Sequence, residues 1–183
     1  MSIKELAEIK LERVPNTTDL FILQDEIELV SPFMRVAFVE NNKYGQMYLK
    51  LEFSDINKNV QMHKFYTFIY TIENVFFKKI CHLLNLQDCV LSSQLYKKEN
   101  SKYPPLLTIK VPKNKKQKYV CAKIINSDKR TFYDIQRSEY VRVKITAKYI
   151  WNNTKKMTLR WNVSELEFRD VDKDEDDKNC EYT

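Results

Sequence analysis

The stretch VRVKITAKYIWNNTKKMTLRWNVSELEF, residues 141–168, indicates the fold because apolar and polar residues alternate through most of it. Alternation of this kind is typical of a β-strand that buries one face and exposes the other. We therefore expect two antiparallel strands, at residues 141–151 and 156–168. The apolar face of the first contains Val141, Val143, Ile145, Ala147, Tyr149 and Trp151, and that of the second contains Met157, Leu159, Trp161 and Val163.

These two strands constrain each other's register. If both apolar sets face one core, the numbers of paired residues must sum to an even number, so the loop around Asn152 should contain three or five residues. Tyr149, Trp151 and Trp161 are then expected to pack in the core. The reverse side collects five cations, which are Arg142, Lys144, Lys148, Lys156 and Arg160.

Strand periodicity also occurs on both sides of one helical segment. It predicts strands at residues 19–29, 33–40, 46–53, 89–97, 106–111 and 118–125, with NNKYG at 41–45 as a turn and KNKKQK at 113–118 as a lysine-rich hairpin loop. Residues 62–84 instead repeat apolar side chains at three- and four-residue steps, which predicts a long amphipathic helix packed on the sheet. Its apolar positions are Phe65, Phe68, Ile69, Ile72, Phe76, Ile80 and Leu83 or Leu84.

The combined pattern predicts a mainly β (α+β) fold, built as a β-barrel or a strongly curved sheet of five or more strands. A single domain should span residues 1–169. Its first 18 residues form an arm, in which the capping-box spacing of Ser2 and Glu5 begins a short helix that ends before Pro15. Residues 170–183 are expected to form a disordered acidic tail.

Charge is distributed unevenly along the chain. The tail, DVDKDEDDKNCEYT, has seven carboxylates and two lysines, which gives it a net charge of −5. Because the whole chain has a net charge of +6, the other 169 residues carry +11. A basic body with an acidic tail indicates a protein that binds a polyanion and masks its own site, although a tail that only improves solubility is the alternative. The tail residues assigned to masking or partner binding are Asp172, Asp174, Glu175, Asp176, Asp177 and Tyr182.

Several classes of chemistry are not supported by the sequence. The four cysteines lack CxxC spacing, and neither His63 nor His82 belongs to a nucleophile or zinc motif. One glycine in the whole chain excludes a glycine-rich phosphate loop. No segment approaches the roughly 20 apolar residues of a membrane span, and MSIKELAEIK is not a secretory signal. We expect an intracellular protein without enzymatic activity, metal, cofactor or membrane segment.

Basic and aromatic residues are interleaved in the second half of the chain, and residues 97–130 alone hold eleven cations and two acids. Cations neutralise phosphates, and aromatic rings stack on unpaired bases. Single-stranded nucleic acid is therefore the first candidate ligand, with Tyr119 and Phe132 as stacking residues. The complete candidate set is Lys110, Lys113, Lys115, Lys116, Lys118, Tyr119, Lys123, Arg130, Phe132, Arg142, Lys144, Lys148 and Arg160.

Four segments carry a resemblance to a known family: SPFMRVAF at 31–38, YLKLEF at 48–53, LLTIKVP at 106–112 with its lysine loop, and VRVKITAKYIWNNTKKMTLRWNVSELEF. They resemble the single-stranded DNA-binding proteins of large nucleocytoplasmic DNA viruses, which are similar in layout to those of T7-like phages. The resemblance implies an OB-like β-barrel that coats single-stranded DNA during replication and recombination. It also implies a tail that contacts replication proteins, and a site of action in the host cytoplasm, with the nucleus left open.

Two other readings stay open. An RNA-binding module would use the same cations and rings, and a viral structural or scaffolding protein would pack its basic face against an acidic partner. Assembly as a homodimer is also left open. Binding to single-stranded DNA that weakens steeply with salt would separate a nucleic-acid binder from a packing protein.

Overall fold

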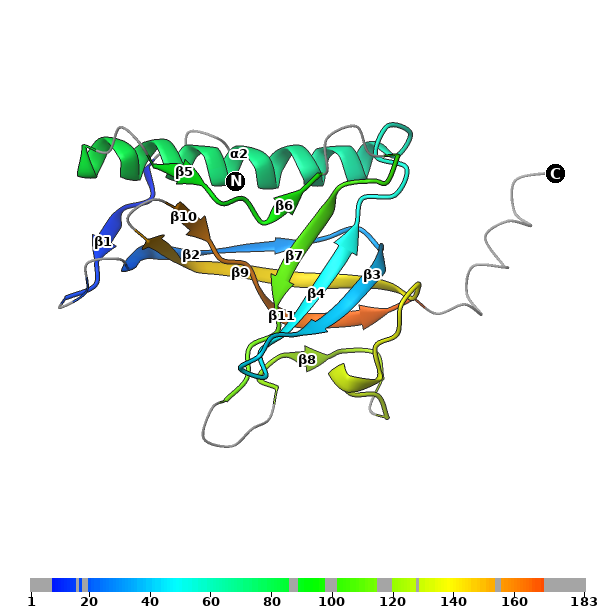
Figure 1. The fold of residues 1–183 in the computed structure, drawn as a ribbon. Coiled ribbons are helices and arrows are strands. Elements are labelled where there is room, and N and C mark those ends of the chain that lie inside the picture. Colours follow the sequence, from blue (N-terminus) through cyan, green and yellow to red (C-terminus); the bar gives the residue numbers. More distant parts are fainter. Residues whose placement is uncertain are drawn as a thin grey trace.

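The computed structural model describes residues 8–15, 17, 20–85, 89–97, 102–114, 120–127, 129–153 and 156–169. Figure 1 shows a curved sheet with one long helix lying along it. The elements are β1 (Leu11–Arg13), β2 (Leu20–Val30), β3 (Met34–Asn41), β4 (Met47–Glu52), α2 (Val60–Leu84), β5 (Val90–Leu91), β6 (Leu95–Tyr96), β7 (Leu106–Lys110), β8 (Lys123–Ile124), the 3-10 helix η1 (Phe132–Asp134), β9 (Tyr140–Asn153), β10 (Lys156–Leu159) and β11 (Asn162–Phe168).

Five of these strands close into a ring. β3 pairs with β4, β4 with β7, and β9 pairs with both β3 and β11, all antiparallel. The ring closes between the parallel strands β7 and β11, where Asn162 is the partner of Lys110 and the Lys110 amide donates to the Trp161 carbonyl at 2.9 Å. A five-stranded ring with one weakly joined seam is typical of OB-like folds. The predicted mainly β fold is confirmed.

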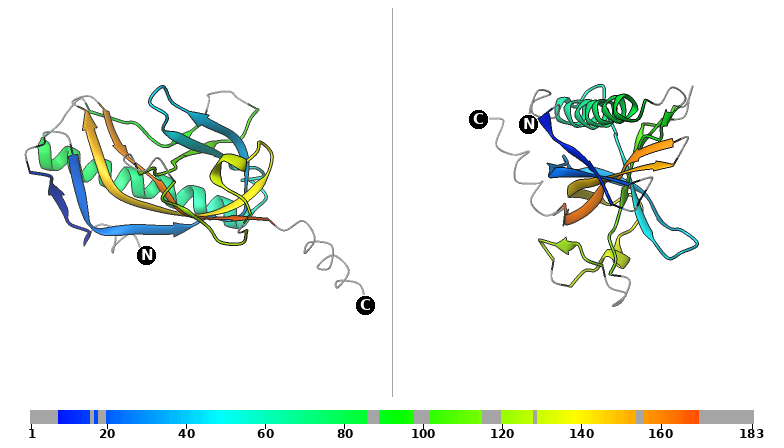
Figure 2. Two further views of the ribbon diagram at one scale, coloured as in Figure 1. Left: turned by 90° about the horizontal axis from the view of Figure 1, so that it is seen from below. Right: turned by 90° about the vertical axis from the view of Figure 1, so that its left-hand side faces the viewer.

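Further strands extend the ring, so the sheet is not a simple barrel. β9 has 14 residues. Its residues 144–151 pair with β2, and residues 150–153, which lie past the ring, pair with β10. β1 adds to β2, β5 adds to β10, and β6 adds to β7. α2 runs along one side of this extended sheet in all views (Figure 2).

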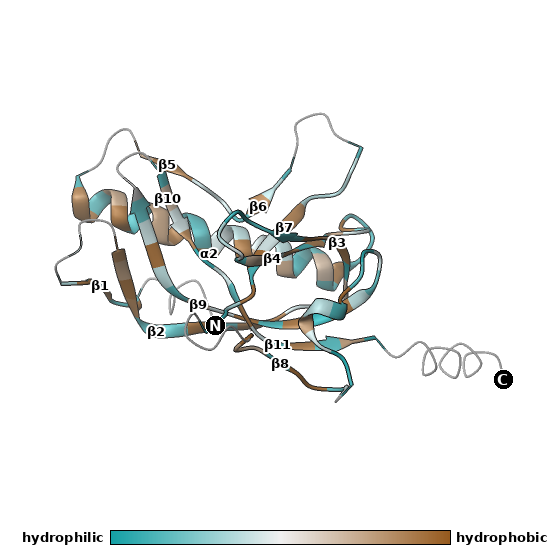
Figure 3. Ribbon diagram, turned by 60° about the horizontal axis from the view of Figure 1, so that its bottom comes forward, coloured by the Kyte–Doolittle hydropathy of each residue, from teal (hydrophilic) through white to brown (hydrophobic). Residues whose placement is uncertain are grey.

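The helix forms where its periodicity predicts it. The Asn59 side chain caps its first turn by accepting from the Met62 amide at 3.0 Å, and Asn85 ends it in a left-handed conformation with φ 50°. Apolar and polar residues alternate along α2 (Figure 3). Its buried side chains are Met62, Phe65, Ile69, Ile72, Glu73, Phe76 and Ile80, whereas Leu83 is exposed and Leu84 packs at the edge of the core.

One buried residue of α2 is a carboxylate that no periodicity reveals. Glu73 is 1% exposed. It accepts hydrogen bonds from the Ser93 hydroxyl, from the Gln94 amide at 3.2 Å and from Trp161 Nε1 at 3.2 Å. Burial raises its pKa above the ordinary value, and these three hydrogen bonds oppose that rise. Glu73 thus joins the helix to the β5–β6 segment and to the start of β11.

The predicted register of the final two strands is wrong. Asn152 pairs with Met157 and Ile150 with Leu159, so paired numbers sum to an odd number, and two residues separate β9 from β10. The inward face of β9 changes phase between Ala147 and Ile150, which are both buried. The register of β2 against β9 shifts at this point, between the pairs Ile22–Tyr149 and Ile27–Ala147, and this irregularity of the ladder lets the two halves of β9 bury different sets of alternate residues.

This phase change decides which aromatic residues are buried. Ile150 is buried, while Tyr149 and Trp151, expected in the core, are 39% and 44% exposed. The predicted strand at 156–168 breaks at Arg160 and Trp161 into β10 and β11. Its buried face continues across the break as predicted, because Met157, Leu159, Trp161 and Val163 are all buried.

Two smaller expectations also need correction. The expected strand at 118–125 is reduced to β8, which pairs with β11 rather than with β7, although a single bridge joins Lys113 to Val120. The expected strand at 89–97 is split into β5 and β6. In the expected N-terminal arm, Leu11–Arg13 forms β1 and pairs with β2, and most of the segment expected to form the short helix lies outside the described residues. Residues 1–7, most of the lysine loop and the acidic tail lie outside the described residues.

Candidate nucleic-acid interface

Strands β4 and β7 present a polar outer face because their alternate residues fill the core. Leu49, Leu51, Leu107 and Ile109 are fully buried. The residues between them point outward in matched rows, because Tyr48 pairs with Lys110, Lys50 with Thr108 and Glu52 with Leu106. In OB-like folds, the face of the second and third ring strands binds oligonucleotides, and those strands correspond here to β4 and β7.

Two adjoining cavities, of about 750 and 480 Å³, lie at the lower end of β4 and β7 in Figure 1 and share Lys110 and Arg160. We call them together the β7 groove. Its cations are Lys110, Lys113 and Arg160, and its aromatic side chains are Tyr44, Tyr48, Tyr133, Tyr149 and Trp151. The described residues that line it include no aspartate or glutamate.

The β3–β4 turn forms one wall of the groove. The Asn42 side chain accepts from the amides of Tyr44 at 2.9 Å and Gln46 at 3.0 Å, and Gly45 takes φ 72°, which a residue with a Cβ rarely adopts. This turn leaves Tyr44 79% exposed at the rim. Lys113 holds the turn in place by donating from Nζ to the Gly45 carbonyl at 2.9 Å.

Lys113 and Arg160 both lie against aromatic rings of the groove. Lys113 Nζ is 5.2 Å from the centre of the Tyr133 ring, and the Arg160 guanidinium is 5.6 Å from that of Trp151. Tyr133 belongs to η1, which Thr131 and Asp134 cap reciprocally. The amide and the hydroxyl of Thr131 both donate to the Asp134 carboxylate. These hydrogen bonds, together with the nearby charge of Arg130, hold the pKa of Asp134 below its usual value.

The predicted basic face of β9 does not join the groove. Arg142 is ion-paired with Glu167 at 3.4 Å and lies 4.3 Å from the centre of the Phe33 ring. Lys144 pairs with Glu28 at 3.1 Å, and that hydrogen bond and charge raise its pKa. Cross-strand carboxylates therefore neutralise this face, which sequence periodicity alone presents as uniformly basic.

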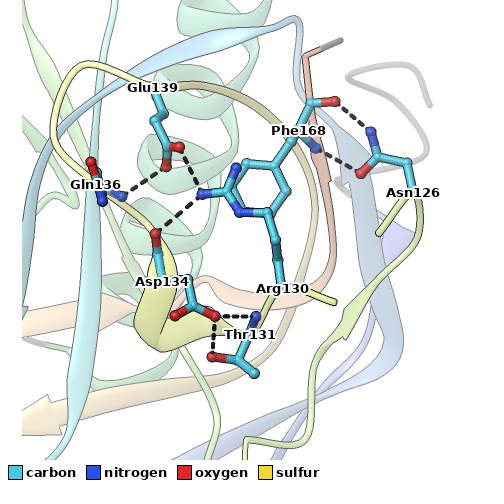
Figure 4. Close-up of polar contacts among 7 residues, drawn as sticks. All are labelled: Asn126, Arg130, Thr131, Asp134, Gln136, Glu139 and Phe168. Atoms are coloured by element: carbon cyan, nitrogen blue, oxygen red, sulfur yellow. Dashed lines mark hydrogen bonds and ion pairs between the residues drawn. The ribbon is translucent and has the colours of Figure 1, made fainter. Parts of the chain in front are cut away.

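Two candidate residues, Arg130 and Phe132, are held within the fold instead, and Figure 4 shows the contacts of Arg130. Arg130 donates to Glu139 Oε1 at 2.7 Å and to the Asp134 carbonyl at 3.1 Å, and its guanidinium lies 3.5 Å from the centre of the Phe168 ring. Phe132 is 3% exposed within the core. The expectation that the Phe132 ring stacks on a base is wrong, because η1 turns that ring inward and Tyr133 outward.

The other candidates are dispersed. Lys123 is exposed on β8 opposite Glu165 of β11, and Lys148 is half-buried on β9 without lining the groove. Lys115, Lys116, Lys118 and Tyr119 lie outside the described residues. Of the thirteen sequence candidates, the structure brings together Lys110, Lys113 and Arg160.

Sequence reasoning did not assign Tyr44, Tyr48 or Tyr133 to a site, and it placed Tyr149 and Trp151 in the core. A usable signal existed for Tyr44 and Tyr48. Tyr44 lies in the NNKYG turn, and Tyr48 alternates with the buried Met47 and Leu49. For Tyr149 and Trp151 there was none, because their exposure depends on the phase change within β9.

Within the described parts of the chain, no three histidine, cysteine, aspartate or glutamate side chains are grouped so as to hold a metal ion. No helix of the described residues combines the length and apolar character needed to cross a membrane.

Fold and site together define a class: a mainly β protein with an OB-like ring and a basic, aromatic groove across its outer face. No protein-family model matches the chain, and no curated protein matches its sequence. Among solved structures, it is similar to the crystal structure of gp2.5, a single-stranded DNA-binding protein encoded by bacteriophage T7. The two share 11% sequence identity, with a TM-score of 0.49, over 87% of this chain and 99% of the phage chain.

Proposed function

We propose that this protein binds single-stranded DNA in the β7 groove with little sequence preference. One observation carries the proposal: three cations and five aromatic side chains meet in a groove whose described lining has no carboxylate. Cations of this kind neutralise phosphates regardless of sequence, and the rings offer flat faces to bases.

Exposed rings favour a single strand over a duplex. Stacking of one base on an aromatic side chain contributes about 1–3 kcal/mol, and it requires a base that is not already stacked in a helix. Tyr44, Tyr133 and Trp151 are 79%, 61% and 44% exposed, so their faces are accessible from solvent. RNA can use the same contacts, and it is therefore the comparison ligand in the test.

The two tryptophans provide the test, because Trp151 lines the groove and Trp161 is fully buried. Titration with oligothymidylate should quench the fluorescence of the wild-type protein, and Trp151→Phe should abolish the quenching while Trp161 still emits. Affinity should fall steeply as salt rises and should be weaker for duplex DNA of the same length. If the protein is instead a viral scaffolding protein with a basic packing face, oligothymidylate should not quench its fluorescence. Equal quenching in Trp151→Phe and in the wild type would place the ligand away from the groove.

The biological role that we propose is to coat single-stranded DNA during viral replication and recombination, in the cytoplasm or nucleus of the infected cell. In this role residues 170–183 compete with DNA for the groove and contact replication proteins. Charge supports this part, because a segment of net charge −5 is tethered to a site with three cations.

Chain length is compatible with self-masking. β11 begins at Asn162, which lines the groove, and ends six residues later at Phe168, about 20 Å away. The 14 residues from 170 to 183 can span up to about 45 Å when extended, which is enough to return to the groove.

A further inference from the structure

A second aromatic hollow lies on the same outer face as the β7 groove. Its volume is about 350 Å³, and it is formed at the upper end of β4 and β7 in Figure 1, beside β6. Phe38 of β3 forms one wall, Tyr96 of β6 and Tyr103 form the other, and Glu52 and Leu106 form the floor. We call this hollow the β6 trough.

The trough and the groove share both floor strands. Tyr48 lines the groove and Glu52 lines the trough, four residues apart on β4, which corresponds to about 13 Å. On β7, which runs antiparallel to β4, Lys110 lines the groove and Leu106 lines the trough, also four residues apart. The cross-strand pair of Lys50 and Thr108 lies between the groove and the trough. One extended ligand can therefore follow β4 and β7 from the groove into the trough.

Aromatic rings in the trough are open to solvent. Phe38 is 42% exposed, Tyr96 59% and Tyr103 71%. Cations lie beside two of them, because Arg137 is 5.2 Å from the centre of the Phe38 ring and Lys102 Nζ is 5.7 Å from that of Tyr103. A base between these walls would meet a ring, and its phosphate would meet a cation.

Carboxylates near this path are already paired. Glu52 lies 3.6 Å from the Arg35 guanidinium, and Glu40 pairs with Lys50 at 2.8 Å. Arg137 adds a positive charge at the wall. The balance of charge around the trough therefore suits a polyanion better than an acidic or neutral peptide.

We propose that the β6 trough is a second base-binding subsite, which a single strand of nucleic acid enters after it has filled the β7 groove. This inference rests on the proposed function and deepens it, because it assigns a path and a length to the site. The occupied length should exceed what the groove alone holds. OB folds bind about 4 to 16 nucleotides, and two subsites place this protein above the lower end of that range.

The test compares a short oligothymidylate of about 4 nucleotides with a long one of about 12, lengths chosen within the OB range. The variant is Tyr96→Ala combined with Tyr103→Ala, both exposed positions whose loss should leave the core intact. Its matched control is Tyr70→Ala, an aromatic residue 54% exposed on α2. Fluorescence anisotropy measures each affinity, and circular dichroism checks the fold.

The trough variant should bind the long oligonucleotide about 5- to 100-fold more weakly than the control, and the short one equally well, because the short one fills the groove first. Equal affinities of variant and control at both lengths would overturn the second subsite, and would leave a peptide partner as the occupant of the trough. Loss of binding at both lengths in Lys110→Gln with Arg160→Gln identifies the groove independently. If the wild-type protein binds neither oligonucleotide, the proposed function itself fails.

Discussion

Arg130, Arg142 and Arg160 carry the same guanidinium but meet different neighbours. Arg130 is held by Glu139 and lies against Phe168, and Arg142 is ion-paired with Glu167. Arg160 lies in a groove whose described lining has no acid, against the ring of Trp151. At the scale of the residue, the neighbouring side chains decide whether a cation supports the fold or lies in the groove that we propose to bind DNA.

Arg130 should therefore matter for stability and not for binding. We expect Arg130→Gln to lower the free energy of unfolding by about 1–2 kcal/mol, because it removes a cation–aromatic contact and an ion pair. Urea denaturation measures this change. Affinity for oligothymidylate should match that of the wild type within error. A large loss of affinity with unchanged stability would return Arg130 to the binding site.

Glu73 should make stability depend on pH. Burial raises its pKa above 4.5, so the folded state holds the proton at a pH where the unfolded chain has released it. The free energy of unfolding should therefore fall as pH rises from 4.5 through the raised pKa, relative to Glu73→Gln, which cannot ionise. Denaturation of both proteins over a pH series measures the difference. A constant difference would contradict the shifted pKa.

Removal of the Glu73 carboxylate should also lower the free energy of unfolding, because hydrogen bonds in the interior are lost. Glu73→Ala leaves the Gln94 amide and Trp161 Nε1 without their acceptor in the core, at about 1–3 kcal/mol for each group. Glu73→Gln keeps an acceptor oxygen for them. We expect the alanine variant to be the less stable of the two at neutral pH, as measured by the same urea denaturation.

At the scale of the element, β9 takes part in both the ring and the groove. Its first half, with Val141, Val143 and Ile145 buried, belongs to the closed ring. Across the phase change between Ala147 and Ile150, its outward side presents Tyr149 and Trp151 to the groove. One strand can do both because it bends where its neighbours have register shifts.

Two pairs of cations on neighbouring elements should differ in their effect on binding. Lys110→Gln with Arg160→Gln should weaken single-stranded DNA binding and reduce the slope of log affinity against log salt by about 0.7 per lost phosphate contact. The matched control is Arg142→Gln with Lys144→Gln, whose cations face Glu167 and Glu28. The control should keep the wild-type slope. Equal slopes for the two double variants would show that the groove is not the phosphate path.

At the scale of the whole molecule, β11 connects the groove to the acidic tail. Asn162 lines the groove at one end of the strand, and Phe168 lies at the other. The Phe168 ring contacts Arg130, and the Phe168 backbone is hydrogen-bonded to the side-chain amide of Asn126. The last described residue, Arg169, donates its amide to the Tyr140 carbonyl at 3.0 Å. The tail thus leaves from an anchored point, which defines the region that it can reach.

Deletion of residues 170–183 raises the net charge from +6 to +11 and removes a tethered competitor. We expect stronger binding to single-stranded DNA, a smaller gain on duplex DNA, and a gain that shrinks as salt rises, because charge holds the tail to the groove. Titrations of full-length and truncated protein at low and moderate salt check this. An equal gain on duplex would leave bulk charge as the cause, and no gain at low salt would exclude self-masking.

The sequence alone determined the fold class and the position of the long helix. Local periodicity is enough for both, since α2 and the strands β2, β3, β4 and β7 lie within two residues of their predicted bounds. It also pointed to the kind of ligand that we propose, because the excess of cations and rings is a property of composition. Lys110, Lys113 and Arg160 were among the residues it proposed, together with others that the fold disperses.

Tertiary structure decided which of those residues meet. The phase change in β9, the closure of β7 onto β11 and the ion pairs of Arg142 and Lys144 all depend on contacts between residues far apart in the chain. No local pattern encodes such contacts, because a strand's periodicity does not say which neighbour will insert a bulge or face it with a carboxylate. For that physical reason the groove and the trough became visible only when the strands were paired.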